Sequence, residues 1–168
     1  LNVLEAIREV KTVRSAVIIT TDKCYENTKK NKGYTEDDPM GGFDPYSSSK
    51  GAAELLISSY RNSFFSGLDF KNHKTAIASA RAGNVIGGGD WAQDRLVPDI
   101  MESIFTGKEI VLRNPTQVRP WQHVLEPTFA YLKLAEYLRK ENIKFTGGWN
   151  FGPDSKEEKT VEWITSTL

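Results

Sequence analysis

A tyrosine and a lysine that could act together in proton transfer, Tyr46 and Lys50, lie four residues apart and are separated by three serines. In a helix this spacing places the phenol and the ammonium group on one face, one turn apart. A free phenol ionises only near pH ~10, and a cation held nearby favours its charged form. The pair therefore predicts a phenol that removes a proton while Lys50 supports the charge. The alternative is an ordinary helix start at the surface.

A hydroxyl group upstream of this pair could take part in the same chemistry. Thr21 ends an apolar, β-branched run at residues 15–21 and precedes Tyr46 by 25 residues. A hydroxyl at the end of a strand can share the proton of a substrate hydroxyl with the phenol. Thr21, Tyr46 and Lys50 thus give three parts of a hydride-transfer site in a plausible order.

A glycine-rich segment and two arginines indicate where phosphate could bind. Residues 80–91 (ARAGNVIGGGDW) follow an apolar run, and their glycines expose backbone N–H groups that can approach a diphosphate closely. Arg113 and Arg119 lie in a later loop region together with Trp121. The guanidinium fork matches phosphate oxygens through charge-assisted hydrogen bonds. We therefore expect a phosphate-bearing ligand here, with simple turns and surface arginines as the alternatives.

The elements that would position these residues alternate between helices and strands. Apolar periodicity predicts helices over residues 1–10, 50–65, 97–105 and 126–140, the second with an N-cap among Ser47, Ser48 and Ser49. Short apolar runs predict strands over residues 15–21, 75–81 and 110–112. Such alternation favours a parallel α/β sheet, whose ligands bind outside the carboxyl ends of the strands. The long loops at 21–45 and 82–95 follow such strand ends and hold the candidate residues.

Composition limits the partners and the compartment. The 168 residues carry 22 Lys and Arg against 22 Asp and Glu, so no overall field recruits nucleic acid or anionic lipid. The single cysteine, Cys24, can form no internal disulfide and is expected to be a buried small residue, and two histidines provide no metal cluster, so we predict no metal site. The single cysteine is typical of a reducing, cytoplasmic compartment, which we predict. No apolar run reaches the ~18 residues of a membrane span, so no membrane anchor is predicted.

The order of Thr21, Tyr46 and Lys50 resembles the extended short-chain dehydrogenase/reductases, in which the tyrosine deprotonates a sugar hydroxyl while NAD takes the carbon-bound hydride. The resemblance extends from residue 1 to about residue 153. It implies a Rossmann-like, doubly wound parallel sheet and homodimerisation through the helices at 1–10 and 47–65. It also implies NAD as cofactor, with contacts from Thr20, Tyr46, Lys50, Ala82 and Val85.

Two strings narrow the resemblance to the CDP-glucose 4,6-dehydratases: Asp-Lys-Cys-Tyr at 22–25 and Asp-Pro-Met-Gly-Gly-Phe-Asp-Pro-Tyr at 38–46. In sugar 4,6-dehydratases an Asp directly after the Ser/Thr protonates the leaving 6-hydroxyl, a role that the resemblance implies for Asp22. Lys23 stands where the dTDP-glucose enzymes have Glu, and a base near it would take the carbon 5 proton. A turn-capping carboxylate and a solvated charge are the alternatives for these two residues.

The resemblance also implies a pocket for a nucleotide sugar. The segment at 81–91 looks like the family's link between nicotinamide and sugar nucleotide, and an Arg-x-Trp-x-x-Val segment such as the one beginning at Arg119 grips the diphosphate. Residues 149–153 match a strand end and are assigned to packing. The implied substrate-binding residues are Asn84, Trp91, Arg95, Val97, Arg113, Arg119 and Trp121, with Pro98 beside them.

A dinucleotide-binding opening of the form Gly-x-Gly-x-x-Gly does not occur in these 168 residues. If the family architecture holds, the adenosine-binding half lies upstream and a C-terminal portion is absent too. We therefore expect residues 1–90 to be the C-terminal half of a Rossmann-like NAD-binding domain with the catalytic residues. Residues 91–168 would be mostly a sugar-nucleotide-binding portion with returning Rossmann elements. Such a fragment is expected to be inactive alone.

The resemblance implies a lyase that converts CDP-glucose to CDP-4-keto-6-deoxyglucose and water, feeding dideoxysugar and lipopolysaccharide O-antigen biosynthesis. Two alternatives stay open. One is another sugar-nucleotide epimerase or dehydratase, although an epimerase has no use for an acid at Asp22. The other is a non-catalytic module that binds a nucleotide sugar, which would suit a chain without a dinucleotide loop.

Overall fold

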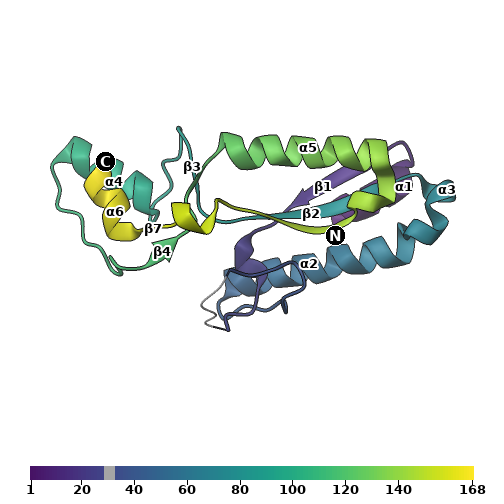
Figure 1. Ribbon diagram of the computed structural model, residues 1–168, viewed down its shortest axis with the longest axis horizontal. Helices are drawn as coiled ribbons and strands as arrows, with labels where there is room; N and C mark the ends of the chain where they lie inside the picture. The colour runs from purple at the N-terminus through teal and green to yellow at the C-terminus, as the bar shows by residue number, and fades with distance from the viewer. Residues whose placement is uncertain (29–32) are drawn as a thin grey trace. The chain divides into compact units, whose positions relative to one another are not determined.

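The computed structural model describes residues 1–28 and 33–168 and divides the chain into two compact units (Figure 1). The first unit comprises Leu1–Ala82 and Thr128–Phe151, and the second comprises Gly83–Pro127 and Gly152–Leu168. We predicted a division at residue 90 from the expected function. The first compact unit instead ends at residue 82 and also includes residues 128–151. The predicted loop at 21–45 includes residues 29–32, which lie outside the described residues.

A three-stranded parallel sheet forms the centre of the first unit. Its strands are β1 (Ser15–Ile19), β2 (Ala76–Ala82) and β6 (Gly147–Phe151), in the order β1-β2-β6. Ser15 is the register partner of Ala76 in the first pair, and Ala78 is that of Gly147 in the second. The predicted parallel α/β arrangement is therefore confirmed, and β2 is the central strand of the three.

Helices cover both faces of this sheet, with α5 along one face and α2 along the other (Figure 1). The predicted helices at 1–10 and 126–140 are confirmed within one residue at each end. The helical elements are α1 (Asn2–Val10), η1 (Asp22–Cys24), α2 (Pro45–Phe64), η2 (Gly67–Asp69), α3 (Phe70–His73), α5 (Leu125–Glu141) and η3 (Asn142–Phe145), where η marks a 3-10 turn.

Alternation along β2 assigns its residues to two different cores. The alanines at 76, 78 and 80 pack with Leu134 and Leu138 of α5, and their small side chains let that helix approach closely. Ile77 points the other way and packs with Leu4, Ile7 and Ile57 of α1 and α2. Residues 79 and 81 continue the second face, so side chains at the carboxyl end of β2 are directed toward α2.

Helix α2 begins earlier than predicted. The serines at 47–49 are not its N-cap, because the helix starts at Pro45 and Asp44 accepts a hydrogen bond from the Ser47 N–H at 3.0 Å. Proline is well suited to a first helical position and aspartate to an N-cap, so the Asp44-Pro45 dipeptide overrides the serine run. As a result Tyr46 lies inside the first turn of the helix.

The second unit is built from two helices and two small strand pairs. The predicted strand at 110–112 is wrong, since these residues pair with no strand in the described part of the chain, and three residues without a ladder partner do not form one. The pairing is made instead by β3 with β5, in parallel, and by β4 with β7, antiparallel. The elements are β3 (Val85–Ile86), α4 (Leu96–Thr106), β4 (Val118–Arg119), β5 (Gln122–His123), η4 (Ser155–Glu157), β7 (Lys159–Thr160) and α6 (Val161–Thr167).

None of the helices in the described ranges 1–28 and 33–168 is both long enough and apolar enough to cross a bilayer.

Candidate active site

The first two turns of α2 present the phenol and the ammonium group of the predicted pair. Tyr46 is 55% exposed, Lys50 is half-buried, and the Lys50 Nζ lies 5.7 Å from the centroid of the Tyr46 ring. Within residues 1–28 and 33–168 no carboxylate forms an ion pair with Lys50. Both groups are therefore available to a ligand.

The end of β1 and the turn η1 bring three predicted residues into one polar cluster. The buried Thr21 hydroxyl donates to Asp22 Oδ1 at 3.1 Å and lies 3.5 Å from the carbonyl oxygen of Ala82. It also accepts from the Lys23 backbone N–H at 3.3 Å, which caps the turn. Lys23 Nζ lies 3.3 Å from Asp22 Oδ2. The Asp22 carboxylate thus contacts both a hydroxyl and an amine, one through each oxygen.

Close backbone packing fixes η1 against α2. A Cβ atom at Gly51 would lie 2.9 Å from the carbonyl oxygen of Gly41 and 3.2 Å from that of Cys24, so only glycine permits this approach. The Gly41 N–H donates to the Cys24 carbonyl at 2.9 Å in the same place. Because Gly51 directly follows Lys50, the turn that holds Asp22 and Lys23 packs beside the helical turn that holds Lys50.

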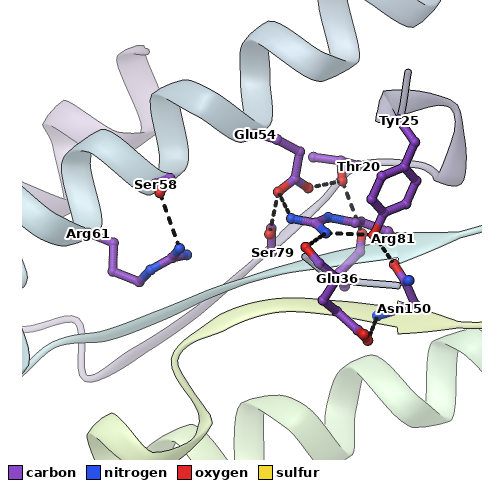
Figure 2. Close-up of polar contacts among 10 residues, drawn as sticks. Thr20, Tyr25, Glu36, Glu54, Ser58, Arg61, Ser79, Arg81 and Asn150 are labelled. Atoms are coloured by element: carbon purple, nitrogen blue, oxygen red, sulfur yellow. Dashed lines mark hydrogen bonds and ion pairs between the residues drawn. The ribbon is translucent and has the colours of Figure 1, made fainter. Parts of the chain in front are cut away.

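A buried ion pair lies beneath these segments, between Glu54 of α2 and Arg81 of β2 (Figure 2). Arg81 Nη2 donates to Glu54 Oε2 at 2.7 Å, and the Ser79 hydroxyl donates to the same oxygen at 2.7 Å. The Thr20 hydroxyl donates to the other oxygen, Oε1. Burial by itself would raise the pKa of Glu54, but the hydrogen bonds from Arg81, Thr20 and Ser79 hold it below its ordinary value. Glu54 is therefore an ionised, fully engaged carboxylate.

The network continues from Arg81 to the third strand. Arg81 Nη1 donates to the Tyr25 hydroxyl at 2.7 Å, and that hydroxyl donates to Asn150 Oδ1 at 2.6 Å (Figure 2). Asn150 is the register partner of Arg81, so both side chains lie on the same face of the sheet. Gly148 leaves room for the guanidinium, since a Cβ there would lie 2.2 Å from Arg81 Nη2. The network therefore spans β2, β6 and the segment that follows η1.

Glu54 was not singled out from the sequence, and no buried network was predicted. Tyr25 and Arg81 were used only within the strings at 22–25 and 80–91, and residues 149–153, which include Asn150, were assigned to packing. A usable signal was present, because Glu54 lies three residues before Ile57 on the apolar stripe of α2, and Arg81 ends an apolar strand. Opposite charges on two buried surfaces are expected to meet, because an unpaired buried charge is costly.

The first half of the second unit holds Asn84, Trp91 and Val97, which are predicted to bind the substrate, and Val85, which is a predicted cofactor contact. The carbonyl of Asn84 accepts from the Gln122 N–H at 3.0 Å, Val85 is in β3, and Val97 is in α4. Trp91 is exposed and lines a cavity of about 490 Å³ beside α4. Asp99 and Glu102 also line this cavity and no cation does, so its charge does not suit a diphosphate. The cavity lining is Trp91, Ala92, Gln93, Pro98, Asp99, Glu102, Phe105 and Thr106.

The predicted arginines of the second unit differ in their surroundings. Arg95 pairs with Asp90 at 3.0 Å and Arg113 with Asp94 at 3.5 Å, both at exposed positions. Arg119 is half-buried in β4, opposite Lys159. The indole N–H of Trp121 donates to the Lys159 carbonyl at 3.1 Å, which fixes that ring by a backbone contact. Binding of a nucleotide sugar by these residues stays a prediction.

Comparison with known proteins identifies relatives of the whole chain. A model of the NAD dependent epimerase/dehydratase family matches residues 1–146. The chain is 51% identical over 167 residues to a CDP-glucose 4,6-dehydratase of Salmonella typhimurium, covering 99% of this chain and 46% of that protein. The predicted resemblance to the CDP-glucose 4,6-dehydratases is therefore confirmed.

Solved structures share the fold at lower identity. A dTDP-glucose 4,6-dehydratase from Bacillus anthracis in complex with NAD has a TM-score of 0.73 at 22% identity, over 98% of this chain and 47% of that one. A UDP-glucose 4-epimerase from Thermus thermophilus in complex with NAD has a TM-score of 0.76 at 22% identity, over 98% of this chain and 50% of that one. The chain thus spans about half the length of the proteins it matches, and the predicted α/β fold is confirmed.

Proposed function

Because the chain belongs to the NAD-dependent epimerase/dehydratase family, we propose that the protein containing it is a nucleotide-sugar 4,6-dehydratase that acts on CDP-glucose. The observation that carries this proposal is the contact cluster of Thr21, Asp22 and Lys23 beside the helical turn of Lys50. An oxidoreduction site alone needs a hydroxyl and a phenol. Asp22, whose carboxyl group is hydrogen-bonded to the Thr21 hydroxyl, adds the acid that water elimination requires.

Tyr46 and Lys50 suit the nicotinamide and ribose part of NAD. An exposed phenol and an ammonium group without a carboxylate partner, in the described residues, are donors suited to ribose hydroxyls and to the nicotinamide face. Tyr46 and Lys50 would hold this part of the cofactor, with Thr20, Ala82 and Val85 as the further predicted contacts. When bound, NAD accepts a hydride from the sugar and later returns it.

Each residue of the cluster then has a defined task. Tyr46 removes the proton of the 4-hydroxyl group, with Lys50 supporting the phenolate and the Thr21 hydroxyl sharing the proton. Oxidation at carbon 4 acidifies the proton at carbon 5, which a base near Lys23 takes. Asp22 donates a proton to the departing 6-hydroxyl group, so that water leaves. The base that took the carbon 5 proton returns a proton to carbon 5 when the 6-deoxy carbon is formed. The proton that Tyr46 took from the 4-hydroxyl offsets the one that Asp22 gave to the water, so no proton is gained or lost overall.

The test uses the longest natural protein that contains these 168 residues, with NAD+ and, separately, CDP-glucose, dTDP-glucose and GDP-mannose. We expect loss of water from CDP-glucose alone, followed by mass spectrometry of the nucleotide sugar. Replacing Asp22 by Asn should lower water loss by about 10²- to 10⁴-fold, the usual range for a general acid, while oxidation at carbon 4 persists.

Asp69→Asn is the matched control, because Asp69 is an exposed aspartate of η2 outside the cluster and should leave water loss unchanged. An epimerised sugar without loss of water would reject the dehydratase in favour of an epimerase. An unchanged sugar with all three substrates would also reject the dehydratase. Equal water loss by Asp22→Asn and the parent protein would reject the assignment of the acid.

A further inference from the structure

The carboxylate of Glu54 contacts elements on both sides of the proposed site without being part of it. Glu54 lies one turn after Lys50 on α2 and is only 4% exposed. Its two oxygens are committed in different directions, Oε1 to the Thr20 hydroxyl and Oε2 to Ser79 and Arg81 (Figure 2). One side chain therefore joins the helix of Tyr46 and Lys50 to the ends of β1 and β2.

The two residues that flank the catalytic turn are tied to the same ion pair. Thr20 directly precedes Thr21 and bonds to Glu54, while Tyr25 directly follows η1 and bonds to Arg81 at 2.7 Å. Burial raises the pKa of Tyr25, so its phenol stays protonated and donates onward to Asn150 at 2.6 Å. The segment 21–24 is thus anchored at both ends by Glu54 and Arg81.

Stability alone gives a poor account of this arrangement. Burying two charges costs desolvation energy that the ion pair only about balances, and apolar side chains of similar size often stabilise a protein equally well. A network in which every carboxylate oxygen has a directed partner instead selects one orientation of the groups that it joins.

We infer that Glu54 is a positioning residue of the proposed dehydratase, which acts by holding the Thr20–Thr21 end of β1 in one placement against the Tyr46–Lys50 turn of α2. The inference rests on the proposed function, because it assigns Thr21 and Tyr46 to one reaction. Glu54 is buried and both of its oxygens bond to protein groups, so we assign it no contact with substrate or cofactor. Since Tyr46 and Lys50 share a helix, their mutual placement does not depend on Glu54, whereas the placement of Thr21 does.

Two single substitutions separate positioning from plain stability. Thr20→Val keeps the side-chain shape and removes the hydroxyl that bonds Glu54 Oε1, whereas Ser79→Ala removes a buried bond to Oε2 and leaves β1 untouched. Displacing one reacting group by ~1 Å can cost ~10²-fold in rate. We therefore expect Thr20→Val to lower kcat by about 10- to 100-fold and Ser79→Ala to leave it within about twofold.

The shape of the kinetics is a second readout. The KM for the nucleotide sugar, the KM for NAD+ and the pH midpoint of the rate should stay the same in Thr20→Val, because the Tyr46–Lys50 pair is unchanged. A raised KM for NAD+ would instead report loss of the predicted contact between Thr20 and the cofactor. Equal loss of kcat in both variants would show a structural role only, and an unchanged kcat in Thr20→Val would reject the inference. Tyr25→Phe tests the other flank in the same way and covers the case that Thr20→Val fails to fold.

Backbone hydrogen exchange decides the question without any substrate. The Lys23 and Cys24 amides, which bond to Thr21, should exchange about tenfold faster in Thr20→Val and at the parent rate in Ser79→Ala, because only the former frees the segment. If the parent protein converts no nucleotide sugar, the proposed function fails. The exchange comparison then still accepts or rejects Glu54 as the residue that holds this segment.

Discussion

The two faces of the β1-β2-β6 sheet are built in different ways. Toward α5, β2 presents only alanines, which pack with Leu134, Leu138 and aromatic side chains. Toward α2, the amino end of the same strand presents Ile77, but its carboxyl end presents Ser79 and Arg81, which bond to the buried Glu54. One strand therefore contributes an apolar core on one side and a charged network on the other.

We infer from this difference that the α5 face mainly stabilises the fold. The α2 face also fixes the position of the helix relative to the strand ends. Apolar packing is tolerant of direction, and many arrangements bury the same area. Hydrogen bonds to a buried carboxylate are directional, so they fix α2 relative to the strand ends where Thr21 and Asp22 lie. The following substitutions test whether stability and activity separate between the two faces.

The largest effect is expected from breaking the charged face. Arg81→Met leaves Glu54 buried without its cation, and removal of one partner of a buried pair costs about 3–5 kcal/mol in the free energy of unfolding. Burial would lower the pKa of Arg81, and the bonds to Glu54 and Tyr25 raise it instead, so the guanidinium is charged in the native protein. Denaturant unfolding followed by circular dichroism measures the loss.

The double variant Glu54→Leu with Arg81→Met supplies the control for this prediction. Removing both charges together should recover stability to within about 1 kcal/mol of the parent protein, since no charge is left unpaired. Turnover should not recover, because the link from α2 to Thr20 is still missing. Recovery of both stability and turnover would show that the Glu54–Arg81 network contributes only to packing and not to the positioning of Thr20.

On the α5 face, we expect a substitution to lower stability by a smaller amount and to leave turnover unchanged. Leu138 is fully buried, and Leu138→Ala creates a cavity that costs about 2–4 kcal/mol. At a temperature where the variant is fully folded, its kcat should match that of the parent protein. A kcat that falls as steeply as in Thr20→Val would contradict the separation of the two faces.

Acid should weaken the charged face selectively, with a modest effect. The native pKa of Glu54 lies below its ordinary value of 4.5, so its stabilisation is complete above that value and is lost as the pH falls through the lower native pKa. Glu54→Gln removes this part of the acid dependence of unfolding. Unfolding curves for both proteins from about pH 7 to about pH 3 measure it.

Glu136 on α5 is the matched comparison for the acid experiment. Hydrogen bonds from Lys140 and Lys133 lower its pKa to about 2, yet this group is solvent-accessible. Its acid dependence should therefore disappear at ~1 M salt, where the Debye length is ~3 Å, whereas that of Glu54 should persist. Each substitution to Gln measures how much its carboxylate contributes to the acid dependence of unfolding. If salt reduced the two contributions equally, the Glu54 carboxylate would be in contact with solvent.

Local sequence patterns predicted the parts of this structure that depend on near neighbours. The predicted helix at 126–140 agrees with α5 within one residue at each end. The candidate site residues are also near neighbours in the chain, as are Tyr46 and Lys50, or Thr21 with Asp22 and Lys23. The strand at 110–112 failed because a strand requires a partner that composition does not reveal. The predicted start of α2 was wrong because Asp44, and not one of the serines at 47–49, caps the helix and Pro45 begins it.

The buried network could not be predicted in this way because it depends on sheet register. Glu54 and Arg81 are 27 residues apart, and a shift of one residue in β2 would turn Arg81 toward α5. Asn150 meets Tyr25 only because β6 pairs with β2 in the observed register. Gly148 marks the place where the guanidinium lies, but its meaning is visible only in three dimensions.

Cys24 provides a chemical reporter for the motion of the turn η1. It is the single cysteine among these 168 residues, it is fully buried, and burial raises its pKa to about 11. We therefore expect a thiol reagent in neutral solution to react with Cys24 only when the packing of η1 against α2 opens. The rate of labelling reports how often Asp22 and Lys23 leave their places, with no probe added to the chain.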